Sequence, residues 1–121
     1  MVEFYFNITK TKESWIMVGV APPTFDQNRL DNHRSKGEGY FYNCHHGDIF
    51  SKTQRAYGKA YPGSKKIDEG QQIGVSVDFT DLTISFIVDG ENLGTAFQFP
   101  KKTQLFPALL LMHAGDVVEW I

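Results

Sequence analysis

The sequence predicts an all-β protein, a two-sheet antiparallel β-sandwich formed by one domain. Short segments in which apolar and polar residues alternate recur along the chain, as in half-buried strands. No helical period persists over ten residues. An Asp89-Gly90 pair between two alternating segments is a strong hairpin signal, because both residues tolerate the positive φ of a type I′ turn. Regular short strands without helices are typical of two packed sheets.

The first half of the chain contains five expected strands separated by polar turns. Residues 15–20 are apolar almost throughout, which predicts a strand buried on both faces. Pro22-Pro23 ends that strand, and Thr24–Gly39 is polar and aperiodic, which predicts a long surface loop. Alternation places Tyr40 and Tyr42 on one face of their sheet and Phe41 on the other. The five expected strands are 2–8, 15–20, 40–43, 48–51 and 54–60.

The second half is expected to form two hairpins between Ile67 and Leu110, followed by a last strand over 116–121. Residues 73–77 and 82–88 alternate, and residues 93–99 alternate again beyond the Asp89-Gly90 turn. The chain begins and stops inside expected strands, so we expect a domain excised from a longer protein.

Composition excludes several classes of protein. With 41% apolar and 21% charged residues, the 121-residue chain is globular. The net charge is −2 and no basic stripe is present, so nucleic acid is not an expected partner. The longest nearly apolar run, 105–112, is too short to cross a membrane as a helix. Because Cys44 is the single cysteine, no internal disulfide can form, and we expect a reducing compartment, the cytoplasm or alternatively the nucleus. We also expect a monomer.

A series of residues in the second half resembles the SPRY domain family. In order these are Gly70, Ile73-Gly74, Asp78, Ile84, Phe86, Asp89-Gly90, Leu93-Gly94, Phe97 and Phe106-Pro107-Ala108. Upstream, Phe4–Ile8 and Val18-Gly19-Val20 resemble the opening strands of that family. The resemblance implies a bent β-sandwich of lectin-like topology. It also implies a protein-interaction module without catalysis, whose partners are gripped by loops at one rim.

Potential metal ligands crowd together at Cys44, His45, His46 and Asp48. Adjacent side chains of an extended segment point apart, and no second ligand pair lies nearby in sequence, so we interpret the cluster as a hairpin turn without metal. A Cys44–His45 nucleophilic dyad is disfavoured because dyad partners come from distant segments. We expect no metal and no cofactor.

Two acidic patterns are weak candidates for chemistry. Asp78 and Asp81 could form a carboxylate pair for glycoside hydrolysis, but they bracket an expected turn, where Asp is common. Residues 26–31 hint at a calcium loop but lack the glycine and the final glutamate of the EF-hand pattern. We expect neither to be a site.

The leading hypothesis is recognition of a short peptide or protein loop by a rim built from four segments. Tyrosines gather beside the long polar loop, and tyrosine is enriched at binding hot spots. Ordinary core-rim packing of these tyrosines is the alternative. A carbohydrate-binding module and a structural domain that docks within its parent protein also remain open. The four segments are 24–39, 43–47, 61–70 and 79–81. The expected ligand-binding residues are Asn32, Tyr42, Asn43, His45, Tyr57, Tyr61 and Thr80.

Overall fold

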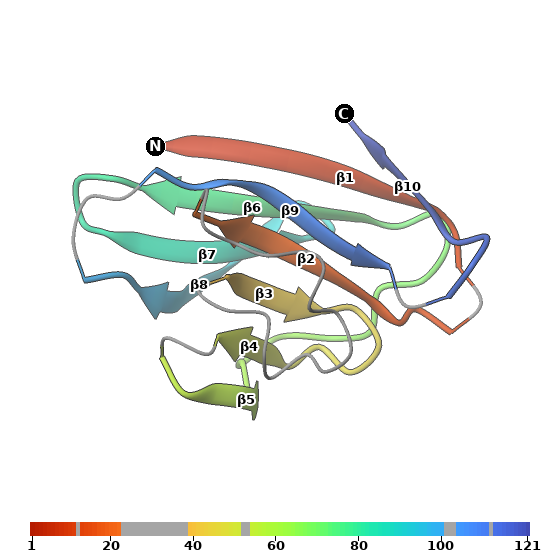
Figure 1. Ribbon diagram of the computed structural model, residues 1–121, viewed down its shortest axis with the longest axis horizontal. Coiled ribbons are helices and arrows are strands. Elements are labelled where there is room, and N and C mark those ends of the chain that lie inside the picture. The colour runs from red at the N-terminus through yellow and green to blue at the C-terminus, as the bar shows by residue number, and fades with distance from the viewer. Residues whose placement is uncertain (12, 23–38, 52–53, 101–103, 112) are drawn as a thin grey trace.

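A computed structural model describes residues 1–11, 13–22, 39–51, 54–100, 104–111 and 113–121. In these ranges the secondary structure consists of strands and turns, with no helix (Figure 1). No described helix could therefore span a membrane. The strands are β1 (Val2–Lys10), β2 (Ile16–Ala21), β3 (Tyr40–Asn43), β4 (Ile49–Ser51), β5 (Ala56–Lys59), β6 (Gln72–Asp78), β7 (Thr83–Val88), β8 (Glu91–Gln98), β9 (Phe106–Leu111) and β10 (Val117–Trp120).

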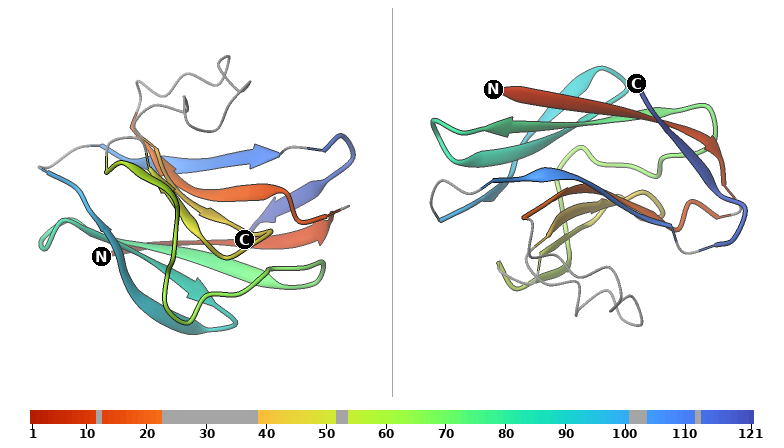
Figure 2. Two further views of the ribbon diagram at one scale, coloured as in Figure 1. Left: turned by 90° about the horizontal axis from the view of Figure 1, so that it is seen from below. Right: turned by 45° about the horizontal axis from the view of Figure 1, so that its top comes forward.

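The strands form two five-stranded sheets packed as layers (Figure 2). One sheet has the order β10-β1-β6-β7-β8 and the other has the order β5-β4-β3-β2-β9. Paired neighbours run antiparallel in both sheets. The first and last strands of the chain lie side by side at an edge of the first sheet. The predicted antiparallel β-sandwich is confirmed.

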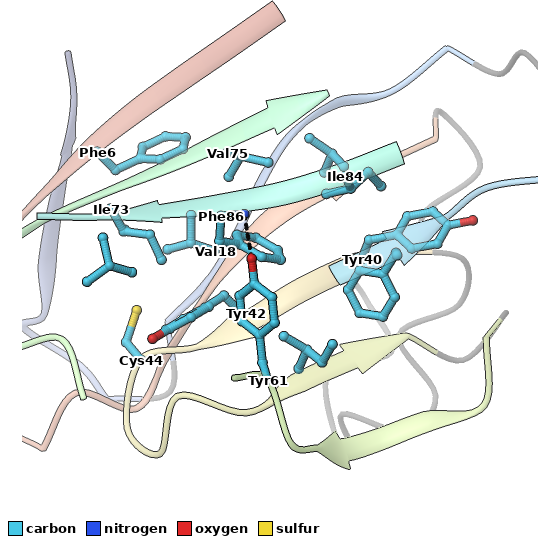
Figure 3. Close-up of a cluster of buried hydrophobic side chains, with 14 of the residues drawn as sticks. Phe6, Val18, Tyr40, Tyr42, Cys44, Tyr61, Ile73, Val75, Ile84 and Phe86 are labelled. Carbon is cyan, nitrogen blue, oxygen red and sulfur yellow. Dashed lines mark hydrogen bonds between the residues drawn. The ribbon is translucent and has the colours of Figure 1, made fainter. Parts of the chain in front are cut away.

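The core lies between the sheets and follows the alternation of the strands (Figure 3). Tyr40 and Tyr42 face this core, whereas Phe41 belongs to a second apolar cluster on the outer face of its sheet. Every residue of β2 is buried, because β2 supplies side chains to both clusters. Both predictions for these strands are therefore confirmed. The second cluster contains Met17, Ala21, Phe41, Phe50, Ala108 and Leu110.

The Asp89-Gly90 pair forms the predicted two-residue turn between β7 and β8. Asp89 has φ 51° and Gly90 has φ 80°, and positive values at both positions are the signature of a type I′ turn. β1 continues two residues past the predicted end, because Lys10 still pairs with Val117 of β10 beyond an irregularity in the ladder. The connection to β2 is displaced to residues 11–15, because β2 begins at Ile16.

Strand direction separates three of the four predicted rim segments into two groups. β6 runs from Gln72 to Asp78, so the loop before it and the 79–81 turn after it lie at opposite ends of the sandwich (Figure 1). The 43–47 turn lies at the same end as the loop before β6, since the Cys44 carbonyl accepts a hydrogen bond from the amide of Ile67 at 2.9 Å. The prediction of one shared rim was therefore wrong. Most of the 24–39 segment lies outside the described residues.

We call the end that carries the 43–47 turn the histidine rim, and we define it as residues 13–15, 44–48, 60–71 and 113–116. It contains His45, His46 and His113. The opposite rim contains the 79–82 turn.

Candidate functional site

The turn between β3 and β4 is organised from within by Asn43. Its side-chain Oδ1 accepts a hydrogen bond from the amide of His45 at 3.0 Å. Its carbonyl accepts one from the amide of Gly47 at 2.7 Å, and its own amide donates to the carbonyl of Asp48 at 2.8 Å. Because Asn43 is only 2% exposed, these bonds are shielded from water and fix the shape of the turn.

Neighbouring segments hold the same turn from both sides. The amide of Cys44 donates to the carbonyl of Ile16 in β2. Next to it, the hydroxyl of Tyr42 donates to the carbonyl of Lys65 at 2.6 Å and accepts from the amide of Lys65 at 3.0 Å. The turn is therefore locked to β2 and to the 60–71 loop, and its exposed side chains have a fixed frame.

An aromatic stack lies on this frame. The rings of Trp15 and His45 are stacked, with centroids 3.8 Å apart and planes 13° from parallel. His46 meets Trp15 edge-on at 5.5 Å. The Nδ1 atom of His45 lies 2.5 Å from the carbonyl oxygen of Glu13, and because a carbonyl only accepts, Nδ1 must carry the proton. The stack is half-buried at Trp15 and His45 and exposed at His46.

A histidine and a glutamate border the stack. The Nε2 atom of His113 lies 3.5 Å from the Oε2 atom of Glu13, which is itself exposed. The histidine rim thus combines flat rings, imidazole nitrogens and a carboxylate on a rigid base. Such a surface can bury a partner side chain and hydrogen-bond its backbone.

Three of the predicted contact residues are buried. Tyr42, Asn43 and Tyr61 are 0%, 2% and 5% exposed, and their polar atoms bond to the protein's own backbone. Figure 3 shows both tyrosine rings within the core. The interpretation as direct contacts is corrected accordingly: these residues position the rim and leave no side-chain surface for a ligand. The alternative of core-rim packing describes Tyr42 and Tyr61.

The remaining predicted residues are dispersed. His45 belongs to the stack, whereas Tyr57 is 45% exposed on β5 and Thr80 is exposed on the opposite rim. Asn32 and the 26–31 segment lie outside the described residues. The sequence reasoning missed Trp15, which was assigned to a buried strand, and Asp48, which was considered only as a metal ligand. The feature that could have identified Trp15 is its position directly before β2, outside the sheet.

The crowded cysteine and histidines do not form a nucleophilic pair. Cys44 is completely buried, and burial raises the pKa of its thiol well above the ordinary value, which keeps it protonated and inert. Within the described part of the chain, no three His, Cys, Asp or Glu side chains are grouped as a metal would require.

We expect Cys44 to resist alkylation in the folded protein. A buried neutral thiol reacts only when the fold opens, so iodoacetamide at pH 8 should label it at least about a hundredfold more slowly than in denaturant. Mass spectrometry of the alkylated protein measures this ratio. Equal labelling rates in the two states would show that the thiol is accessible.

Tyr42 gives the fold a dependence on alkaline pH. Burial of its ring raises the pKa of the hydroxyl from 10.0 to about 12. The folded state therefore holds this proton more tightly than the unfolded chain does. The resulting stability is fully present below pH 10 and is lost as the pH rises toward 12.

Denaturant titrations across pH 9 to 12 should therefore show a steeper fall in unfolding free energy for the native protein than for Tyr42→Phe. The phenylalanine variant is less stable at neutral pH but has lost the titrating group. Parallel curves would contradict the assignment.

The Asp78–Asp81 pair is a turn and not a carboxylate dyad. Oδ1 of Asp78 accepts from the amide of Thr80 at 2.8 Å and from that of Asp81 at 3.0 Å. The amides of Asp81 and Thr80 lower the pKa of the Asp78 carboxyl. This is the hydrogen bonding of an Asx turn, as the alternative interpretation predicted.

Comparison with known proteins agrees with the architecture. A curated relative, a homologue of Ran-binding proteins 9/10 from Drosophila melanogaster, is 28% identical over 119 residues. The alignment covers 96% of this chain but only 12% of that protein. The solved SPRY domain of human HERC1 superposes with a TM-score of 0.78 at 22% identity, covering 98% of this chain and 72% of that one. Another human SPRY domain superposes with a TM-score of 0.77 at 20% identity, with coverages of 98% and 74%.

The sequence model of the SPRY domain matches residues 3–121, nearly the full length of the chain. Members of this family are generally protein-interaction modules. The chain belongs to the SPRY domain family.

Proposed function

We propose that this SPRY domain binds a short peptide or protein loop through the histidine rim, without catalysing a reaction. The observation that carries the proposal is the rigid 43–48 turn beside the Trp15–His45 stack. A surface that is already ordered loses little conformational entropy on binding, so more of the contact energy appears as affinity.

The stack supplies the apolar part of the contact and the turn supplies the polar part. Aromatic rings bury large areas with few rotatable bonds, and His46 is exposed beside them with two ring nitrogens. We propose that the domain acts as a monomer that recruits its target in a reducing compartment, the cytoplasm or the nucleus. The single buried cysteine supports that location.

A peptide-display selection on the immobilised domain tests the function. We expect enrichment of a shared motif that the native domain retains and a His45→Ala/His46→Ala variant loses. Circular dichroism must first show that the variant is folded. Thr80→Ala is the matched control, because Thr80 is exposed on the opposite rim and only its backbone amide is engaged by Asp78.

The two variants separate the possible outcomes. A motif lost in the double variant and kept by Thr80→Ala supports the histidine rim. A motif lost only in Thr80→Ala would move the site to the opposite rim. If no peptide is enriched, peptide recognition is wrong, and the glycan-binding and intramolecular-docking alternatives are favoured. For the glycan alternative, Tyr42 is buried and offers no ring for a sugar to stack on, whereas the ring of Tyr57 is 45% exposed.

A further inference from the structure

A groove of about 400 Å³ lies on the side of the 43–48 turn that faces β5. Its walls are made mostly of small or apolar residues, so a ligand can approach the backbone closely. Asp48 is the acidic residue among them, and His46 is the exposed aromatic residue. The groove is lined by His46, Gly47, Asp48, Gly58, Ala60, Tyr61, Pro62 and Ser64.

A bulge in β5 makes room for the carboxylate of Asp48. The pairing of β4 with β5 shifts at Ile49–Phe50, which leaves Gly58 as the extra residue. Gly58 has φ +79°, and a Cβ atom at this position would lie 3.1 Å from Oδ2 of Asp48. Both the left-handed backbone and the close approach of the carboxylate therefore favour glycine.

One oxygen of that carboxylate has no partner. Oδ1 of Asp48 is buried and makes no hydrogen bond, although carboxylate oxygens are strong acceptors. Among the described residues, Nε2 of His113 is the other buried side-chain atom without a hydrogen bond, and it faces Glu13. A buried acceptor without a donor is destabilising, and a cation that pairs with the same carboxylate offsets part of that free energy on binding.

Two neighbouring lysines are paired with other carboxylates, and a third lines a different surface. Lys65 forms an ion pair with Asp89 and Lys66 forms one with Asp68. Lys59 lines a different groove, which lies between β5 and β8. In the part of the chain that the structure describes, none of these ion pairs includes Asp48, so its carboxylate is available for a cation from outside.

We propose that the Asp48 groove receives the side chain of an arginine or lysine from the bound protein segment. Its aliphatic stem would lie along Ala60 and Pro62, while its charged group would donate to the carboxylate of Asp48. This inference rests on the proposed function for its setting and adds the chemistry of one anchor residue. The groove opens beside the exposed His46, so one peptide could reach both features.

The direct test is an NMR titration of the ¹⁵N-labelled domain with Nα-acetyl-arginine amide and Nα-acetyl-lysine amide. We expect concentration-dependent shifts at the amides of Gly47, Asp48, Gly58 and Ala60, and weaker binding at high salt. Nα-acetyl-norleucine amide keeps the stem and lacks the charge, so it should bind about tenfold more weakly or not at all. Comparing arginine with lysine identifies which cation fits.

Variants decide whether Asp48 is responsible. Asp48→Asn keeps the shape of the side chain and should weaken binding of the cationic probe about tenfold. Asp81→Asn, which removes an exposed carboxylate from the opposite rim, should change nothing. Ala60→Leu narrows the groove while keeping the charge, and it should also weaken binding. The amide spectrum of each variant reports whether it is folded.

The outcomes remain separate from those of the peptide selection. Equal binding of the cationic and neutral probes, or unchanged binding in Asp48→Asn and Ala60→Leu, overturns the inference. Enriched peptides that lack arginine and lysine and bind Asp48→Asn equally also overturn it, while peptide recognition stands. Binding of the cationic probe at Asp48 without any enriched peptide supports cation binding in the groove and contradicts the proposed peptide recognition.

Discussion

Replacing Gly19 with alanine is expected to destabilise the domain by about 3 kcal/mol or more. Gly19 lies in the middle of β2, between β3 and β9. A Cβ atom there would overlap the carbonyl oxygen of Tyr40 and lie 2.8 Å from its carbonyl carbon and 2.9 Å from Cα of Phe41. Those atoms are backbone atoms of the adjacent strand, so relief requires β3 to move away from β2.

Equilibrium unfolding in urea measures this cost. Gly115→Ala is the matched control, because Gly115 has no atom within 4 Å of the new Cβ and adds only the strain of its φ of +91°. We expect about 1–2 kcal/mol for the control. Similar losses in the two variants would mean that the strands adjust easily and that the steric argument is wrong.

The fold could be predicted from sequence because its strongest signals are local. The two-residue turn at Asp89-Gly90 and the alternation on either side of it fix a hairpin without knowledge of the rest of the chain. The uniform apolar run of β2 similarly predicted burial on both faces. The end of β1 was missed because the pairing of Lys10 with Val117 joins residues more than a hundred positions apart.

The candidate site was harder to predict because burial depends on what packs above a side chain. Alternation placed Tyr42 and Phe41 on opposite faces, but both faces of that sheet are apolar, so the pattern alone could not identify an exposed ring. The grouping of rim segments failed for a different reason. Loops at the two ends of a single strand lie far apart, and applying that rule to β6 would have separated the 79–81 turn from the 61–70 loop.

Asp48 shows what sequence patterns omit. Its residue type is ordinary for a hairpin turn, and its significance depends on a bulge at Gly58 that lies ten positions away. The missing donor for Oδ1 can be recognised only when every neighbouring group has a position.

Tyr61→Phe is expected to cost about 2–3 kcal/mol, although it removes a single oxygen atom. The pairing of β7 with β8 is irregular between Ser85 and Ile87, and the hydroxyl of Tyr61 occupies that gap. It accepts a hydrogen bond from the amide of Phe86 at 3.1 Å (Figure 3) and donates to the carbonyl of Gly94 at 2.5 Å. Phenylalanine would leave a buried donor without a partner and would remove the bond to Gly94.

Urea unfolding of Tyr61→Phe should be compared with that of Tyr5→Phe, whose hydroxyl bonds to Glu3 at the surface and whose loss should cost under about 0.5 kcal/mol. The comparison also decides between the two interpretations of Tyr61. A structural tyrosine loses stability on this change, whereas a contact residue would lose peptide binding with its stability intact. Because Tyr61 also lies beside the Asp48 groove, the hydroxyl that stabilises β7 and β8 also fixes one border of the surface that a basic side chain would meet.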